Sequence, residues 1–381
     1  MNEYKIATRC LYGDGSRVDC DKSGAISFPI YQTATFAHPE VGKSTGFDYS
    51  RLQNPTRAQL ENVIASLEGG CDAVAFSSGM AAVTALMEIF GPGDHIITDQ
   101  DLYGGTIRLF DNINEKNGIE FSHIDFNKEN PGDYIKENTK AIYFETPTNP
   151  MMNVTDIKAM AELAHSFGLL LIVDNTFMSP YFQNPLKLGA DVVIHSGTKF
   201  IGGHNDTIAG FLVTSRTEIA EKLRFIIKTV GSGLAPLDSW LILRGVKTLP
   251  LRMEKSQSNA FELVSWLKNN SHVLKVYYPG IPDNPGYEIC RKQASGFGSM
   301  ITLELDSKAL ALKVLKSVKL IRFAESLGGV ETLITYPVTQ THADVPKDVL
   351  EKNGINDRVL RISVGIEDSG DLISDLENAF R

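Results

Sequence analysis

The stretch DVVIHSGTKF at residues 191–200 joins an apolar, strand-like run to side chains that can do chemistry. The three central residues of DVVIH are consecutive apolar side chains, which is typical of a strand covered on both faces. Two hydroxyls and an amine follow at once, on Ser196, Thr198 and Lys199. Because open α/β sheets bind ligands at the carboxyl ends of their strands, this stretch indicates a site as well as a fold class.

The same pattern recurs through the preceding sequence. Short apolar runs alternate with helical patterns, of which MAAVTALMEIF and IKAMAELAHSFG are the clearest. The strand candidates are DAVAFS, HIITD, FSHID, AIYFET, LLLIVD, DVVIH and AGFLV. Continuous apolar runs separated by helices predict an α/β domain with a mostly parallel sheet, over roughly residues 56–215.

The 381 residues are too many for one ordinary core and suggest more than one domain. Residues 1–55 lack long periodic segments and are interpreted as an extended arm that packs on something else. Residues 56–240 form the predicted large domain, which opens with the helix TRAQLENVIASLEGG, N-capped by Thr56 and ended by Gly69 and Gly70. Residues 241–381 form a predicted smaller α+β domain with a long first helix, strands near MITLEL and VLRISVGI, and the closing helix DLISDLENAF.

Composition excludes several classes of function. The net charge is −9 and no basic block occurs, so neither nucleic acid nor an anionic membrane is expected as a partner. The chain has no apolar run long enough to span a bilayer, and its first residues have no signal-peptide pattern. Its four cysteines are scattered, which favours a reducing, cytoplasmic location, and Cys71 and Cys290 are expected in or near the core. His195 and His204 lack a third ligand at metal spacing, so both are given structural roles and no metal is predicted.

Two further stretches place polar groups at predicted strand ends. In SSGMAA, at 77–82, a strand gives way to a helix, so residues 78–80 form either a plain tight turn or a cradle for a phosphate. In LLLIVDN, at 169–175, the strand ends in Asp174, which is a helix cap, a metal carboxylate or a partner for a cationic ring nitrogen. Lys199 follows 25 residues later, and neighbouring strands would bring both side chains over one crevice.

Pyridoxal phosphate requires a lysine, an acidic residue and a phosphate-binding site in one pocket. A lysine with a lowered pKa forms a Schiff base, and an aspartate keeps the pyridine ring protonated. Any one of these features has an ordinary structural explanation. Their occurrence in order along one α/β sheet favours the cofactor site.

With these residues in view, the chain resembles the Cys/Met-metabolism family of fold-type I pyridoxal phosphate enzymes, which includes cystathionine γ-synthase, γ-lyase and β-lyase and methionine γ-lyase. The resemblance runs over nearly the whole chain. Its motifs are YSRLQNPT (49–56), FSSGMAA, DLYGGT, ETPTNP, VDNTF, HSGTKFIGGHND, ESLGG, THA and RISVGIED (361–368). It implies a large domain with a mostly parallel, seven-stranded type of sheet and a smaller C-terminal α+β domain.

The resemblance also implies roles for residues. Lys199 would hold the cofactor and shuttle protons, and Tyr103 would stack on the ring and take part in proton transfer. The remaining implied cofactor contacts are Asp174 at the ring nitrogen and, at the phosphate, Ser78, Gly79, Met80, Ser196 and Thr198. Tyr49 and Arg51 would complete the phosphate site of the neighbouring subunit, which implies at least a homodimer and, in this family, usually a tetramer. Without the family pattern, Tyr49 and Arg51 would be interpreted as arm surface.

The substrate is expected to be a small amino acid. Arg361 would clamp its α-carboxylate as a bidentate guanidinium, helped by Ser326 and Asn149, although an ordinary ion pair would also explain this arginine. Many γ-synthases and γ-lyases resemble this chain in having a glutamate at the position of Glu325, in AESLGG. The resemblance implies that its carboxylate would bind the distal amino group of cystathionine. Some β-lyases carry aromatic residues in that region instead. Methionine γ-lyases usually have cysteine where this chain has Gly105.

The expected activity is therefore elimination or replacement at a γ-carbon, of the cystathionine γ-synthase or γ-lyase type. The alternatives are a cystathionine β-lyase, a methionine γ-lyase or broader C–S lyase, and a non-catalytic regulatory protein that binds the cofactor.

Overall fold

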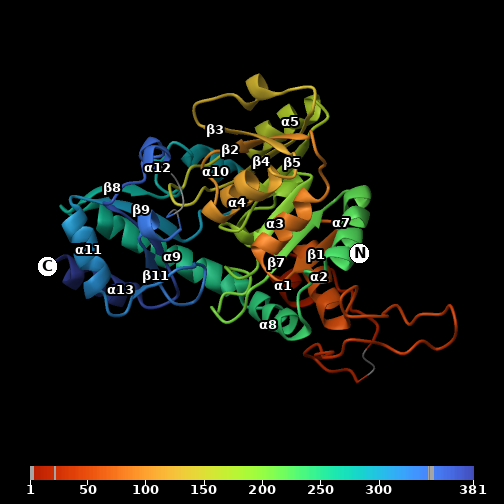
Figure 1. The fold of residues 1–381 in the computed structure, drawn as a ribbon. Coiled ribbons are helices and arrows are strands. Elements are labelled where there is room, and N and C mark those ends of the chain that lie inside the picture. Colours follow the sequence, from red (N-terminus) through yellow and green to blue (C-terminus); the bar gives the residue numbers. More distant parts are fainter. Residues whose placement is uncertain (1–3, 21–22, 342, 344–346) are drawn as a thin grey trace.

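The computed structural model describes residues 4–20, 23–341, 343 and 347–381, and it contains two separate β-sheets. The larger sheet has seven strands in the order β1-β7-β6-β5-β4-β2-β3. Helices pack on both of its faces, and the smaller sheet lies beyond the long helix α9 (Figure 1). This arrangement is the α/β architecture that the sequence predicts.

Each of the seven predicted strands is present in the larger sheet. They are β1 (Asp72–Phe76), β2 (His95–Asp99), β3 (Glu120–Ile124), β4 (Thr139–Glu145), β5 (Leu170–Asp174), β6 (Val192–Ser196) and β7 (Gly210–Thr214). All pairings are parallel except those of β7, which runs antiparallel to both β1 and β6. The carboxyl ends of β1, β4, β5 and β6 therefore meet at one edge of the sheet.

Helices cover both faces of this sheet, which explains why its strands are continuously apolar. On β4, Tyr143 packs in the same buried cluster as residues of α3 (Gly79–Met87) and α7 (Thr217–Val230). Its neighbours Ile142 and Phe144 pack in another cluster, with α5 (Ile157–Ser166).

The helix α2 (Pro55–Glu68) begins two residues earlier than predicted, and its N-cap is Asn54 rather than Thr56. The Asn54 side chain accepts a hydrogen bond from the Thr56 N–H at 3.0 Å. The Thr56 hydroxyl instead donates to the Pro29 carbonyl at 3.0 Å, and so holds the N-terminal segment against the helix. Gly69 ends α2 in a left-handed conformation with φ 78°, as predicted.

The smaller sheet has the order β10-β11-β12-β9-β8 and is antiparallel except for the pair β10–β11. The elements of the C-terminal part are α8 (Pro236–Val246), α9 (Leu249–Lys268), β8 (Val273–Tyr277), α10 (Tyr287–Gln293), β9 (Met300–Leu305), α11 (Lys308–Ser317), β10 (Arg322–Phe323), β11 (Leu333–Thr335), α12 (Lys347–Lys352), β12 (Val359–Ser363) and α13 (Ser369–Phe380). A separate buried cluster joins this sheet to α9, α11 and α13. The long helix, both strands and the closing helix predicted from the sequence are all present.

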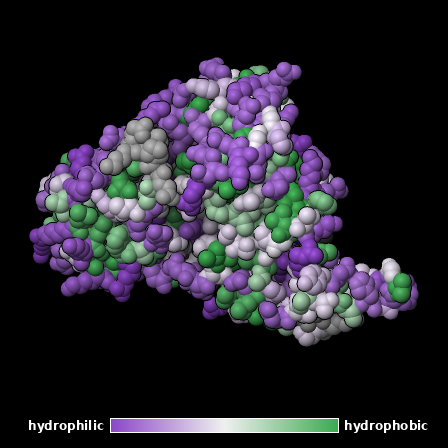
Figure 2. Space-filling model, viewed as in Figure 1, coloured by the Kyte–Doolittle hydropathy of each residue, from purple (hydrophilic) through white to green (hydrophobic). Residues whose placement is uncertain are grey.

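The N-terminal segment contains one short helix, α1 (Ile6–Tyr12), and is otherwise mostly non-helical up to α2. Part of it projects from the body of the molecule as a loop (Figure 1), with apolar residues at its outer end (Figure 2). Ile26 is 92% exposed and Val41 is fully exposed, so this segment has apolar side chains with nothing packed on them in a single chain. The boundaries at residues 55 and 240 stay predictions.

The structure corrects the expectation for one cysteine. Cys290 is buried as expected, but Cys71 is exposed, because it lies in the turn between α2 and β1 rather than within the strand. His195 is buried, with Nε2 2.6 Å from the Glu68 carboxylate. Within the described part of the chain, no helix is long and apolar enough to span a bilayer, and no group of three acidic, histidine or cysteine side chains is arranged to hold a metal.

Candidate active site

A cavity of about 460 Å³ lies at the carboxyl ends of the central strands. Its wall combines segments of the large sheet with Glu325, Ser326 and Arg361 from the C-terminal part. The structure thus brings together all but two of the predicted site residues. Those in the wall are Ser78, Gly79, Met80, Tyr103, Asn149, Asp174, Ser196, Thr198, Lys199, Glu325, Ser326 and Arg361.

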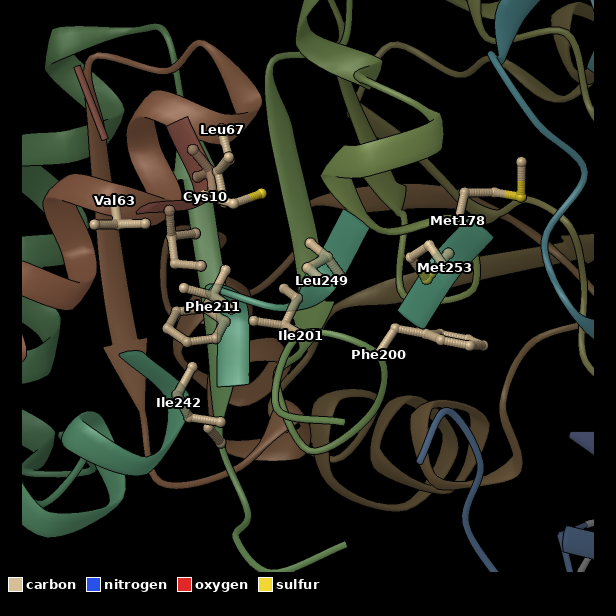
Figure 3. Packing of buried hydrophobic residues seen from close by; sticks show 14 of the residues in the cluster. Cys10, Val63, Leu67, Met178, Phe200, Ile201, Phe211, Ile242, Leu249 and Met253 are labelled. Atoms are coloured by element: carbon tan, nitrogen blue, oxygen red, sulfur yellow. The ribbon is translucent and has the colours of Figure 1, made fainter. Parts of the chain in front are cut away.

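Lys199 lies in the segment after β6, and hydrophobic packing anchors that segment. Phe200 and Ile201, the next two residues, pack in a buried cluster with Ile242 of α8 and with Leu249 and Met253 of α9 (Figure 3). Anchored residues on one side and a strand on the other hold the lysine backbone in a fixed place.

The Lys199 amine donates a hydrogen bond to the Ser326 hydroxyl at 2.8 Å. Burial, with a further contribution from the Arg361 cation, lowers the pKa of Lys199 to about 8, while Glu325 acts in the opposite direction. A buried amine whose pKa lies near neutral pH is unprotonated more often than an exposed lysine, so it is a much better base and nucleophile at physiological pH.

Asp174 ends β5, directly beside β6, so the predicted neighbouring strands are confirmed. Its Oδ1 accepts a hydrogen bond from the Thr176 N–H at 2.9 Å. Burial raises the pKa of Asp174, and the Thr176 hydrogen bonds and His195 only partly oppose this shift. A buried carboxyl in the cavity wall, without an ion pair among the described residues, fits a cationic ring nitrogen as its partner.

The cavity wall around the start of α3 fits a phosphate. The helix begins at Gly79, and its cap Ser78 accepts a hydrogen bond from the Ala81 N–H at 3.0 Å. The N–H groups of Gly79 and Met80 precede the hydrogen-bonding pattern of the helix and can point to an anion. A side chain on Gly79 would lie 3.1 Å from Cβ of Ser196, so glycine allows this close approach. The Thr198 hydroxyl also belongs to the wall, although it donates to the Ala209 carbonyl at 3.3 Å.

Arg361, on β12, joins the two parts of the wall. It donates from Nη1 to Asn149 Oδ1 at 2.8 Å and from Nη2 to the Ser326 carbonyl at 2.9 Å and Thr335 Oγ1 at 3.1 Å. Burial lowers the pKa of the Arg361 guanidinium to about 10. This residue is 1% exposed and has no ion pair among the described residues, so it has the charge to bind a carboxylate. The ordinary ion pair that the sequence left open is not formed with any residue that the structure describes.

Glu145, the last residue of β4, is a site residue that sequence reasoning missed. Its carboxylate accepts hydrogen bonds from the Tyr103 N–H at 3.1 Å and from the Asn149 N–H at 2.9 Å. Burial, and then the charge of Asp174, raises the pKa of Glu145 well above its ordinary value. The signal was available, because ETPTNP places an acid at a strand end just as LLLIVDN does. Thr176, also missed, accepts a hydrogen bond from the Ser196 N–H at 2.9 Å.

Tyr49 and Arg51 are the two predicted residues outside this cavity. They lie together on the N-terminal segment, with the Arg51 guanidinium 5.6 Å from the Tyr49 ring centroid. Arg51 also donates to the Lys228 carbonyl. Of the THA motif, His342 lies outside the described residues.

Comparisons with known proteins agree with this geometry. A family model described as "Cys/Met metabolism PLP-dependent enzyme" matches residues 9–381. The chain is 48% identical over 360 residues to a cystathionine γ-lyase of Bacillus subtilis (strain 168), covering 94% of this chain and 95% of that protein. It is 46% identical over 376 residues to a cystathionine β-lyase of Lactococcus lactis subsp. cremoris (strain MG1363), covering 98% of both.

The chain is also similar to a solved structure, both in sequence and in fold. The cystathionine γ-lyase from Lactobacillus plantarum, complexed with L-serine, superposes with a TM-score of 0.96 at 44% identity, covering 99% of this chain and 98% of that chain. The predicted fold class is thereby confirmed. The similar proteins include cystathionine γ-lyases, β-lyases and a γ-synthase. The comparisons therefore identify this group of activities, but they do not distinguish between its members.

Proposed function

Because the chain belongs to the pyridoxal-phosphate-dependent enzymes of cysteine and methionine metabolism, we propose that it catalyses elimination or replacement at the γ-carbon of a sulfur-containing or activated amino acid. Its activity is then that of a cystathionine γ-lyase or γ-synthase. Bound pyridoxal phosphate supplies an electron sink for the bonds at the substrate α-carbon.

The cofactor is held by three kinds of contact. The N–H groups of Gly79 and Met80 and the hydroxyls of residues 78, 196 and 198 bind the phosphate. Asp174 would pair with the ring nitrogen and favour its protonated form. Lys199 would supply the amine that holds the cofactor. The burial and close approach of these groups support this assignment.

The substrate is bound and deprotonated by the opposite wall. Arg361 receives the α-carboxylate in a bidentate contact, and its bonds to Asn149 and Ser326 fix the plane of the guanidinium. The Lys199 amine would take the proton from the substrate Cα and return it at a neighbouring carbon. The Ser326 hydroxyl, 2.8 Å from Nζ, orients that amine. Tyr103, in the same cavity wall, would cover the ring and take part in proton transfer.

The presence of Glu325 in the cavity wall is the observation that most favours reaction at the γ-carbon. Its side chain is exposed at the cavity wall, next to Ser326 in the sequence. A carboxylate there can bind the second ammonium group of a substrate such as cystathionine. The chain also resembles γ-synthases and γ-lyases in having an acidic residue at this position. A β-lyase is the second candidate, because a relative of that name is 46% identical. A non-catalytic role is disfavoured by the intact set of Lys199, Asp174, Tyr103 and Arg361.

The arm has a proposed role as well. We infer that Tyr49 and Arg51 complete the phosphate site of a second subunit, so that the active enzyme is at least a dimer. Their position outside the cavity of their own chain, and the unpacked apolar residues of the arm, support this inference.

The experiment that tests the proposed reaction identifies the oxo acid formed from cystathionine. Cleavage of the Cγ–S bond consumes water and yields cysteine, ammonia and 2-oxobutyrate. Cleavage of the Cβ–S bond yields homocysteine, ammonia and pyruvate. The first outcome supports the proposal, and the second replaces it with the β-lyase assignment.

A further inference from the structure

Two acidic residues end neighbouring strands of the larger sheet at the cavity. In the parallel pair of β4 and β5, Glu145 and Asp174 are directly opposite each other. Paired residues of a sheet direct their side chains to the same face, and neighbouring strands lie only about 4.8 Å apart. Both residues belong to the cavity wall, and Glu145 is only 8% exposed. The structure therefore places two carboxyl groups side by side, one of them with little access to solvent.

Neither acid has an ion pair among the residues that the structure describes. Glu145 accepts one backbone N–H on each oxygen, from Asn149 at 2.9 Å and from Tyr103 at 3.1 Å. Asp174 accepts the Thr176 N–H at 2.9 Å. Backbone N–H groups stabilise a negative charge but do not neutralise it. If both carboxyl groups were ionised, they would therefore repel each other.

The cations near this pair are directed to other partners. Arg361 donates its hydrogen bonds to neutral oxygens. The Nε2 atom of His195 lies 2.6 Å from the Glu68 carboxylate, and the Lys199 amine donates to the Ser326 hydroxyl. The ionisable side chains around the pair are Asp101 after β2, Tyr103 before α4 (Gly104–Leu109), Tyr143 on β4, His195 and Lys199 at the end of β6, and Arg361 on β12.

Two neighbouring acids without a cation between them retain a proton more readily than either acid would alone. Burial, and then the charge of Asp174, raises the pKa of Glu145, and burial raises the pKa of Asp174. Such a pair titrates as a unit, so the proton belongs to both carboxyl groups. With this proton, the pair carries a single negative charge.

We propose that Glu145 and Asp174 share one proton in the cofactor-free protein and release it to water when the cationic ring of pyridoxal phosphate enters the cavity. This inference rests on the proposed function, in which Asp174 pairs with the ring nitrogen. One carboxyl O–H bond breaks, and both acids are then ionised. The ring cation replaces the charge of the departed proton, so the net charge of the cavity does not change. The two N–H donors on Glu145 stabilise the carboxylate that forms.

This exchange makes cofactor binding depend on pH. Binding that releases a proton is weakened by a high proton concentration, so the affinity for the cofactor falls as the pH falls. One released proton changes the dissociation constant by up to about tenfold per pH unit. Glu145→Gln keeps the size of the side chain and removes the shared proton, so its contribution to this dependence should disappear.

Infrared difference spectra of the full-length protein test the proton directly. Cofactor-free protein is compared, near neutral pH, with protein loaded with pyridoxal phosphate, and the carbonyl stretch of protonated carboxyl groups is followed. We expect the wild-type protein to lose intensity in this band on loading, and Glu145→Gln to lose none. Glu162→Gln, an exposed change on α5, is the matched control and should behave as the wild type does.

The dissociation constant for pyridoxal phosphate gives a second readout. It is measured by absorbance between about pH 6.5 and pH 7.5, in buffers without phosphate or a primary amine. Ionisations of the cofactor itself and of Lys199 contribute equally to each chain, so the difference between chains reports residue 145. The slope of log Kd against pH should differ by about one between the wild type and Glu145→Gln.

A protonated-carboxyl band that persists when the wild-type protein is loaded would overturn the inference. So would an equal loss of this band, or an equal slope, in the wild type and Glu145→Gln. The wild-type spectrum needs no variant, so it decides the matter even if Glu145→Gln does not fold. Neither measurement needs turnover. A wild-type protein that loses the band but does not cleave cystathionine would support this inference and contradict the proposed reaction.

Discussion

At the scale of single residues, the sequence predicted the site where chemistry needs a distinctive side chain at a strand end. Lys199 and Asp174 could be found because an amine and an acid are conspicuous after buried apolar runs. Glu145 was missed although it ends a strand in the same way, because its role is to accept hydrogen bonds from backbone N–H groups: that of Asn149, four residues later, and that of Tyr103, 42 residues earlier. The hydrogen bond between Lys199 and Ser326, 127 residues apart, was equally invisible, because only the packing of the two parts brings these residues together.

The proposed role of Glu325 gives a prediction at this scale. Glu325→Gln keeps the size of the side chain and removes its charge. We expect kcat/KM for cystathionine to fall about fivefold, which corresponds to about 1 kcal/mol for one exposed charge pair. For a C–S substrate without a distal amino group, kcat/KM should change less than about twofold, since no ammonium then needs the carboxylate. Equal losses on both substrates would show that Glu325 does not recognise the distal group.

At the scale of elements, continuous apolar runs predicted every strand of the larger sheet, because helices on both faces require apolar residues at every position. Element ends were less predictable. Helix α2 starts at Pro55 because Asn54 is the cap, and the Thr56 hydroxyl donates to the Pro29 carbonyl of the arm instead. Cys71 was expected near the core because it adjoins an apolar run, but it lies in the turn before β1.

Helix α9 supports the catalytic segment through one buried arginine. Arg252 donates hydrogen bonds to the carbonyls of Phe200, Ile201 and Gly245 at 2.6, 3.2 and 2.9 Å. The first two of these residues follow Lys199 directly. The side chain is 6% exposed, so its removal leaves buried carbonyls without a donor.

We expect Arg252→Ala to destabilise the fold by about 2–3 kcal/mol and to lower Tm by several degrees. Because the segment after Lys199 loses its anchor, the purified variant should also retain less cofactor. Lys255→Ala, an exposed change on the same helix, is the control and should alter neither quantity. A normal Tm for Arg252→Ala, measured by calorimetry on the full chain, would mean that hydrophobic packing alone holds this segment.

At the scale of the whole molecule, the sequence predicted two parts and an arm, and the cavity lies where the two parts meet. The sequence pattern alone could not predict which residues of the C-terminal part face the large sheet. Arg361 was named from the family resemblance, and in the structure it reaches Asn149 across 212 positions of sequence. The arm differs, because Tyr49 and Arg51 lie outside the cavity of their own chain, so their proposed roles stay predictions.

Subunit mixing tests the arm. Lys199→Ala and Arg51→Ala chains are each expected to be inactive or nearly so. If Arg51 serves the neighbouring subunit, unfolding and refolding an equal mixture restores about a quarter of the wild-type activity, because half of the dimers are mixed and each has one intact site. A mixture of Lys199→Ala with Asp174→Ala, two changes in the same cavity wall, should restore nothing. Failure of the first mixture to regain activity would mean that the arm does not complete a neighbour's site.

The central claim, cleavage at the γ-carbon by the amine-bearing cavity, is tested most directly by product identity. The purified protein loaded with pyridoxal phosphate is incubated with cystathionine beside the Lys199→Ala variant, and the oxo acids and thiols are separated and identified. The account predicts 2-oxobutyrate and cysteine in equal amounts from the wild-type protein, and neither from the variant. Pyruvate and homocysteine from the wild-type protein, or 2-oxobutyrate from the variant at a comparable rate, would contradict it.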